Sequence, residues 1–396
     1  MKRPLIVYLD SSDFSTLSDV ARQTPEILAI RETLLEQSRS GKVVFAFSGV
    51  HLSEMSPMGA TFTPSAVGRT NLLVELCQRN AFISIDRLLD AEIARLYKSD
   101  SGFICPLTTD ATWFPELTGF MTPVNWAETV RTMLTSVQDQ AVNRAQRRKL
   151  QRKLGNGAPS SKFHRLMSTS SHEALTAIMQ QYPMRREDAL TLQAYIHGTA
   201  SAEAAEAAFL ASLRDPSWIM KWFAEHHDEL SPVMQWLRSA SAELVAKMGD
   251  IVKFAEKQRQ LHPEVVGEFL KQKWWKGEQD KLLTNLAVRL AGVSREAHSF
   301  SADDVDLKCP GLACMTRTLH SVLWDAVATT PRSLKHSDAV DAMHAIYAPY
   351  CDLFRADRYM APHIQRQVNR LGVRVVSRLS EIPPLINEHI QSATAG

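Results

Sequence analysis

The residue types that could carry chemistry in this sequence are concentrated near its end, where acids recur at short spacing. From Ser337 the sequence predicts a helix, and at about 100° per residue Asp338 and Asp341 fall on one side of it. A third acid, Asp357, follows a short predicted strand, Asp352–Ala356. Carboxylate oxygens are hard ligands that suit Mg²⁺ or Mn²⁺. Three acids that converge at the carboxyl end of a strand therefore predict a divalent-cation site.

Two further acids follow predicted strands in the N-terminal part of the chain. The continuously apolar runs Leu5–Leu9 and Val43–Phe47 are typical of buried parallel strands. Asp10 comes directly after the first run, and Glu54 lies one helical turn beyond His51, behind the second. Because ligands bind at the carboxyl ends of the strands in open parallel sheets, we expect all these acids at one edge of one sheet.

Each acid taken singly also has an ordinary structural interpretation. Asp10 and Asp338 would be helix N-caps, Glu54 a solvated helix residue and Asp357 a turn former. Capping needs one acid per helix, however, and does not account for Asp341 as well. We therefore predict a joint role in metal binding and catalysis for Asp10, Glu54, Asp338, Asp341 and Asp357.

An apolar stripe indicates how the helix that begins near Ser337 packs. Val340, Met343, Tyr347 and Tyr350 recur at helical spacing on the side opposite the acids. We expect this stripe to dock on a core, so that the two carboxylates of the helix point away from it. Histidines in these segments are expected to pack or to form hydrogen bonds rather than to act as general acids.

Strands and helices alternate at both ends of the chain, which predicts a parallel sheet with covering helices. Helices are expected over Glu26–Ser40 and Leu88–Lys98, with a third strand at Ala81–Ile85 between them. The alternation resumes after residue 331 and ends with a helix near Ala361–Leu371 and a strand over Val373–Val376. We predict an α/β domain whose N-terminal part is 1–100 and whose C-terminal part is 332–396.

An all-α insertion is predicted to split this domain, because residues 101–331 show only helical periodicity. Breaks are expected at Gly155–Ser161 and Arg295–Gly311. The candidate helices are Trp126–Leu154, Ser171–Gln181, Glu187–His197, Ala202–Leu213, Trp218–His226, Ser231–Gln260, Val265–Lys276 and Gln279–Ala291.

Composition places the chain among ordinary globular proteins. It has 396 residues, a formal net charge of +2 and five cysteines, which are scattered and odd in number. The charge excludes a polycation of the histone kind, so that a nucleic-acid surface would have to arise from local clustering. The sequence lacks an apolar run long enough for a membrane span and a signal-peptide pattern. We expect free thiols and a cytoplasmic location.

Together these residues resemble the PIN-domain nucleases, most closely bacterial PIN-like proteins with long insertions. The likeness rests on Asp10 after the first strand, on Ser48–Glu54 after the second, and on the blocks Asp338–His344 and Pro349–Arg358. It covers about residues 1–100 and 332–380 and leaves the insertion unmatched. Haloacid-dehalogenase-like hydrolases also place Asp after the first strand, but they would need D-x-D there, and position 12 is Ser12.

The resemblance implies a three-layer PIN-like fold and metal-dependent hydrolysis of phosphodiester bonds, usually of RNA. Asp10, Glu54 and Asp357 would be core metal ligands, with Asp338 and Asp341 as further ligands or as acids that orient water. One or two Mg²⁺ or Mn²⁺ ions would orient the scissile phosphate. They would also relieve the repulsion among carboxylates held close together.

Basic residues indicate where a nucleic acid would lie. Between Gln140 and His172 there are eight Lys or Arg residues and no acid. One helix there could reach backbone phosphates with Arg144, Arg147, Arg148, Lys149 and Arg152. Ser11 and Arg358 are candidate phosphate contacts beside the acids, and the segment Lys271–Lys276 could stack bases. The alternatives are a solvated basic face, a capping hydroxyl, a surface ion pair and buried tryptophans.

Two other functions are compatible with the same residues. A non-catalytic nucleic-acid-binding or scaffold protein would not need Mn²⁺ at the acids. A metal-dependent phosphatase acting on small phosphate esters would use the same acids without the basic segment. For the nuclease we expect nucleic acid as the partner, RNA rather than DNA, and no membrane. A protein partner or self-association through residues 101–331 is a further expectation.

Overall fold

The computed structural model describes most of the α/β part of the chain and three separate helical stretches. By its contacts the chain divides into two compact units, of which one joins Met1–Pro115 with Val233–Gly396 and the other is Glu116–Pro232. Short pieces are also described within 175–180 and 246–264. The longer described ranges are 3–57, 60–97, 104–115, 182–196, 198–225, 272–292, 300–328 and 336–394.

The first unit contains a parallel sheet of four strands in the order β2-β1-β5-β6. β1 pairs in parallel along its length with β2, from Leu5 opposite Val43 onward, and its other edge pairs with β5. This confirms the predicted parallel α/β architecture, with each predicted strand shortened by one or two residues. The strands are β1 (Leu5–Tyr8), β2 (Val43–Ala46), β5 (Leu353–Arg355) and β6 (Arg374–Val376).

The third predicted strand is only partly formed. β3 (Ala81–Phe82) pairs antiparallel with β4 (Leu107–Thr108), a strand that we did not predict. β3 joins the main sheet through a parallel bridge at Phe47 and Ala81, where the Phe82 N–H donates to the Phe47 carbonyl at 2.7 Å. The predicted extension to Ile85 is wrong, because Ile85 already begins helix α5 (Ile85–Tyr97).

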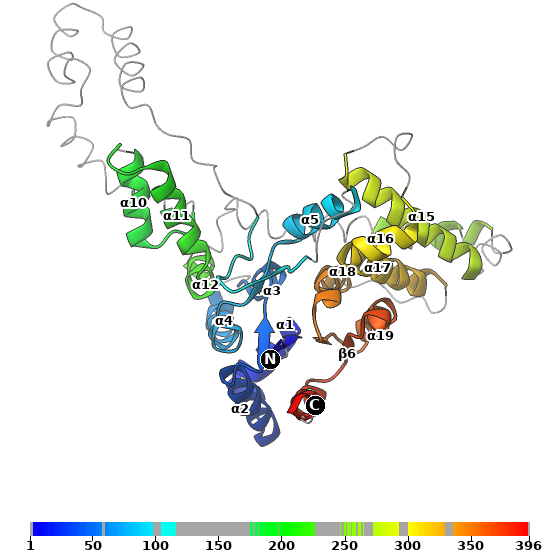
Figure 1. Ribbon diagram of the computed structural model, residues 1–396, viewed down its shortest axis with the longest axis horizontal. Helices are drawn as coiled ribbons and strands as arrows, with labels where there is room; N and C mark the ends of the chain where they lie inside the picture. The colour runs from blue at the N-terminus through cyan, green and yellow to red at the C-terminus, as the bar shows by residue number, and fades with distance from the viewer. Residues whose placement is uncertain are drawn as a thin grey trace, which may run out of the picture. The chain divides into compact units, whose positions relative to one another are not determined.

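Helices of the N-terminal part connect these strands (Figure 1). Thr24 caps α2 with its side chain and Pro25 occupies the first helical position, both of which favour a helix start. The predicted helices over Glu26–Ser40 and Leu88–Lys98 are therefore confirmed with small shifts. The elements are α1 (Ser11–Ser18), η1 (Val20–Arg22), α2 (Pro25–Arg39), α3 (Gly49–Met55), η2 (Ala60–Phe62), α4 (Thr63–Cys77) and α5.

The C-terminal part differs from the prediction in two helices. The helix α20 (Ile382–Thr394) is one that we did not predict. α18 (His336–His344) already includes Ser337 and Asp338, so Asp338 is not its N-cap, and it continues as the 3₁₀ segment η3 (Ala345–Tyr350). Pro349 lies inside η3 and has no N–H to donate, so an α-helix through Tyr350 is disfavoured. The remaining elements are α19 (Met360–Val368), η4 (Asn369–Leu371) and η5 (Leu379–Glu381).

Three helices from the predicted insertion pack on the α/β part. They are α15 (Gln272–Leu290), α16 (Ala302–Lys308) and α17 (Pro310–Ala328), and Figure 1 shows α16 beside α17. α16 and α17 contact α5, and α17 also contacts η3 and α19. The expected break at Arg295–Gly311 is wrong over α16, where Ser301 accepts a hydrogen bond from the Asp304 N–H and caps an acidic first turn.

The second unit contains three described helices that the sequence predicted. They are α10 (Arg186–Ile196), α11 (Ala202–Leu213) and α12 (Pro216–Glu225), and α11 contacts both of its neighbours. Trp222 and Phe223 are buried on α12. Trp126–Leu154 lies outside the described residues, as do most of Ser171–Gln181 and Ser231–Gln260.

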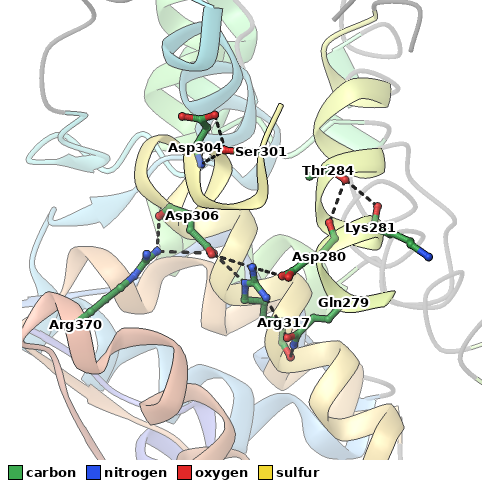
Figure 2. Close-up of polar contacts among 9 residues, drawn as sticks. All are labelled: Gln279, Asp280, Lys281, Thr284, Ser301, Asp304, Asp306, Arg317 and Arg370. Atoms are coloured by element: carbon green, nitrogen blue, oxygen red, sulfur yellow. Dashed lines mark hydrogen bonds and ion pairs between the residues drawn. The ribbon is translucent and has the colours of Figure 1, made fainter. Parts of the chain in front are cut away.

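Arg317 on α17 connects α15, α16 and α17 by ion pairs (Figure 2). Its guanidinium lies 2.8 Å from Asp306 of α16 and 2.7 Å from Asp280 of α15. Gln279 accepts a further hydrogen bond from it, and Arg370 of η4 donates to the backbone of Asp306. Because two carboxylates share the Arg317 guanidinium, it fixes α15, α16 and α17 against one another. Arg370 connects α16 to the C-terminal part.

Glu92 on α5 is a buried carboxylate that joins α5 to the start of α17. It accepts hydrogen bonds from the Gly311 N–H at 2.6 Å, the Leu312 N–H at 2.9 Å and the Tyr350 hydroxyl. A Cβ on Gly311 would lie 2.8 Å from the Glu92 carboxylate, so only glycine fits. Burial raises the pKa of Glu92 to about 7, although these hydrogen bonds act in the opposite direction.

Glu92→Gln is expected to lower the free energy of unfolding by about 1–3 kcal/mol, because its amide would turn a donor toward one of two buried N–H groups. The wild type should also lose stability as the pH rises from about 4.5 to about 7, since the folded-state pKa is the higher one. Urea unfolding between pH 5 and 8 tests both effects. Asp90→Asn, on the exposed side of α5, is the control that should change neither.

Candidate active site

The sheet places the ends of β1 and β5 side by side. The chain runs from β1 to β2 on one side, and it returns as β5 on the other side of β1. In open parallel sheets such a reversal of strand order opens a crevice at the carboxyl ends of the strands, where ligands bind. Asp10 follows β1 and Asp357 follows β5, so these two acids flank the reversal point.

Asp10 is the N-cap of α1, as its structural interpretation predicted. Its Oδ1 accepts a hydrogen bond from the Ser12 N–H at 2.7 Å, while Asp13 accepts one from the Asp10 N–H at 3.0 Å. Asp357 is not the cap of α19, whose N-cap is Tyr359. It forms the turn before that helix, as its structural interpretation predicted, and its Oδ1 accepts from the Met360 N–H at 2.6 Å. Asp10 and Asp357 each use one carboxylate oxygen in these hydrogen bonds, and the second oxygen has no donor among the described residues.

Asp13 is a site-adjacent acid that the sequence analysis did not identify. Its side chain is 2% exposed, and its Oδ1 lies 3.2 Å from the Arg355 guanidinium of β5. Burial raises the pKa of Asp13 to about 7, against the opposing effect of Arg355. The pair of Asp13 and Arg355 fixes α1 to β5, and it therefore fixes the spacing between Asp10 and Asp357. Its only sequence signal is the capping-box spacing from Asp10.

Glu54 is held by a chain of hydrogen bonds that begins at its partly exposed carboxylate and leads into the core. His344 Nε2 lies 2.8 Å from Glu54 Oε2, His344 Nδ1 lies 2.6 Å from the Tyr8 hydroxyl, and that hydroxyl lies 2.7 Å from Ser48 Oγ. The chain links α3, α18, β1 and the end of β2. Burial would raise the pKa of Glu54, but its hydrogen bond and charge interaction with His344 prevail, and the pKa lies below its ordinary value.

His51 fixes the backbone that precedes Asp10. Its Nε2 lies 2.9 Å from the Leu9 carbonyl, which can only accept, so Nε2 carries the proton. Its Nδ1 accepts from the Ser48 N–H at 3.1 Å. Burial lowers the pKa of His51 to about 3, and it is neutral at physiological pH. The expectation that the two histidines form hydrogen bonds is confirmed.

Asp341 lies at the centre of the acid cluster, the name we give to Asp10, Glu54, Asp338, Asp341 and Asp357. Burial and the negative charges of the other four acids together raise its pKa to about 9. The structure therefore brings all five predicted acids within electrostatic reach of one carboxyl group. Asp338 is fully buried, which corrects the expectation that it points away from the core.

The fit of the acid cluster to a divalent cation rests on its donor chemistry. Five carboxyl groups supply hard oxygen ligands. Burial and the negative charge of the other acids raise the pKa of Asp341, and a cation would neutralise that charge. Within the described part of the chain, no group of three or more His, Cys, Asp or Glu side chains has an arrangement that could hold a metal ion. Drawing the acids into a ligand shell would thus require side-chain rearrangement.

The predicted substrate contacts have different outcomes. Ser11 Oγ is buried with no partner in hydrogen-bond geometry among the described residues, yet it is close enough to Glu54 to help lower its pKa. Arg358 is exposed. Trp275 packs against His320 and Trp324, with ring centroids 3.9 Å and 4.5 Å away. Five predicted phosphate contacts lie outside the described residues, namely Arg144, Arg147, Arg148, Lys149 and Arg152.

Tyr8→Phe is expected to weaken Mn²⁺ binding about tenfold, because it removes the hydroxyl that orients His344 and, through it, Glu54. Calorimetric titration with Mn²⁺ measures this. Tyr347→Phe is the matched control, since it removes a buried hydroxyl that donates only to the Ile83 carbonyl at 3.0 Å. Both variants should lose about 1 kcal/mol of stability. Equal Mn²⁺ affinities for the two would contradict an orienting role for Tyr8.

Comparisons with protein-family models, curated proteins and solved structures found no match to this chain. None of the described helices is long and apolar enough to cross a membrane.

Proposed function

We propose that this protein is a metal-dependent nuclease with a PIN-like fold, which hydrolyses phosphodiester bonds of RNA. The observation that carries the proposal is the convergence of five acids on Asp341 at the carboxyl ends of a parallel sheet. A helix cap accounts for Asp10 and a turn for Asp357, but neither role applies to Asp338 and Asp341, which lie inside α18. The four-stranded parallel sheet is compatible with the proposed fold.

Within this proposal, Asp10, Glu54 and Asp357 hold one or two Mg²⁺ or Mn²⁺ ions. Such ions supply Lewis-acid activation of the phosphate and of water. Asp338 and Asp341 complete the ligand set or orient the attacking water. The chain of Tyr8, His344 and Glu54 fixes one ligand, while the pair of Asp13 and Arg355 fixes the spacing of two others. We also propose a cytoplasmic location, since all five cysteines are free thiols.

The test is cleavage of labelled single-stranded RNA and DNA by the full chain with Mn²⁺, with Mg²⁺ and with chelator. Cleavage of RNA that needs the metal supports the proposal. Hydrolysis of p-nitrophenyl phosphate without cleavage of either polymer would instead favour the phosphatase. Mn²⁺ that fails to bind in a calorimetric titration, with no cleavage under any condition, would favour the non-catalytic scaffold.

A further inference from the structure

Arg69 on α4 is a half-buried cation that forms no ion pair with a described carboxylate. Its Nη2 donates to the backbone carbonyl of Met55 at 3.2 Å, and its Nη1 lies 3.4 Å from Ser15 Oγ. Its Nε is buried with no acceptor among the described residues. The guanidinium thus contacts neutral groups and keeps donor capacity unused.

These contacts place Arg69 beside the acid cluster. Ser15 lies on α1, the helix that Asp10 caps, and Met55 directly follows Glu54 in the chain. Burial lowers the pKa of Arg69, whereas the negative charge of Glu54 acts to raise it. Arg69 therefore experiences the field of the cluster from the α4 side without being paired to it.

Two other arginines of this unit, whose side chains are largely buried, have carboxylate partners. Arg355 pairs with Asp13 at 3.2 Å, and Arg317 pairs with two acids. Withdrawing a guanidinium from water without such a partner is costly, because its charge and its donors lose hydration. An anionic ligand that arrives from solvent would supply the missing partner. The planar fork of arginine suits a phosphate group in particular.

We propose that Arg69 forms a phosphate-binding subsite beside the acid cluster and holds a backbone phosphate of single-stranded RNA. The identity of this ligand rests on the proposed nuclease function. Cations at the acid cluster would neutralise one face of the substrate phosphodiester, and Arg69 would bind a phosphate next to it. Arg69 was not among the substrate contacts that the sequence analysis selected, because nothing in its local sequence distinguishes it.

Arg69→Gln is expected to weaken binding of a labelled oligoribonucleotide at least tenfold, measured with Ca²⁺ in place of Mn²⁺. The slope of log affinity against log salt concentration should fall by about 0.7, the value for one phosphate contact on a single strand. The matched control is Arg31→Gln on α2. Arg31 also has a buried Nε without an acceptor, but its guanidinium lies 3.5 Å from Glu75. Equal effects of the two substitutions would overturn the subsite.

A second measurement separates the subsite from the nuclease proposal. Inorganic phosphate, added with Mg²⁺, should raise the unfolding temperature of the wild type and of Arg31→Gln but not that of Arg69→Gln. If this pattern holds and no RNA is cut, the subsite stands and the nuclease function fails. If RNA is cut but phosphate shifts all three proteins equally, the function stands and the subsite is wrong. Without phosphate, a much lower unfolding temperature for Arg69→Gln than for Arg31→Gln would assign Arg69 a structural role instead.

Discussion

Asp10→Asn and Asp357→Asn are each expected to reduce metal-dependent cleavage of single-stranded RNA by at least about a hundredfold. Both residues accept a backbone N–H through a single carboxylate oxygen, and the side-chain oxygen of asparagine can accept the same hydrogen bond. The substitutions should therefore leave the fold intact while they remove negative charge and a hard ligand from the acid cluster. Single-turnover cleavage rates with saturating Mn²⁺ measure the loss.

Asp352→Asn is the control for this comparison, because Asp352 lies at the opposite end of the strand that Asp357 follows. Its carboxylate pairs with Arg3 at 2.6 Å and accepts the Ile6 N–H at 2.8 Å. Asp352 is not among the five predicted metal ligands, and the structure gives it these separate partners. Cleavage that persists in Asp10→Asn and in Asp357→Asn would rule out the acid cluster as the catalytic centre.

Asp341→Asn is expected to stabilise the metal-free protein at neutral and alkaline pH and to abolish most of its stabilisation by Mn²⁺. In the wild type, the folded-state pKa of Asp341 is about 9, whereas its ordinary value is 3.8. Proton binding therefore stabilises the folded protein fully below about pH 4, and this contribution is lost progressively as the pH rises to about 9. Asparagine cannot ionise, so the variant should not lose this contribution.

Urea unfolding of both proteins from pH 5 to 9, with chelator and with Mn²⁺, measures these effects. With chelator, the stability of the wild type should fall more steeply with pH than that of Asp341→Asn. At about a hundred times its Kd, Mn²⁺ should stabilise the wild type by about 2.7 kcal/mol and the variant by much less. Equal pH slopes in chelator would show that Asp341 does not experience the charge of its neighbours. Equal Mn²⁺ effects would remove it from the ligand set.

Local sequence patterns were sufficient for much of the secondary structure. Wholly apolar runs such as Val43–Phe47 predicted buried parallel strands, because a strand covered on both faces has no polar side to show. The cap at Thr24 with Pro25 marks the start of α2 in the same local manner. Errors arose where tertiary contacts compete with local pattern, as at β3, which is limited to two residues by the start of α5.

The grouping of the acids could also be predicted, because Asp10 and Asp357 follow strands while Asp338 and Asp341 fall on one side of a helix. The hydrogen bonds that surround the acids could not be predicted. From the sequence, Tyr8 is an ordinary residue of an apolar strand. In the structure its hydroxyl connects Ser48 to His344, and His344 lies 336 residues from Tyr8 in the chain. Glu92 reads as a solvated helix residue, yet it accepts backbone hydrogen bonds from the start of α17. Such pairings depend on contacts between distant segments, and residue spacing carries no information about them.

The parallel α/β class and the acids that follow its strands can be predicted from the chain alone, since both depend on local periodicity and residue type. Strand order cannot be predicted in this way: in the folded chain β1 lies between β2 and β5, which places Asp10 and Asp357 at the reversal of strand order. The same packing brings Asp341 within electrostatic reach of four other acids and places Arg69 near them, with no carboxylate partner among the described residues. Strand order and burial are properties of the packed chain, because they depend on which distant surfaces meet.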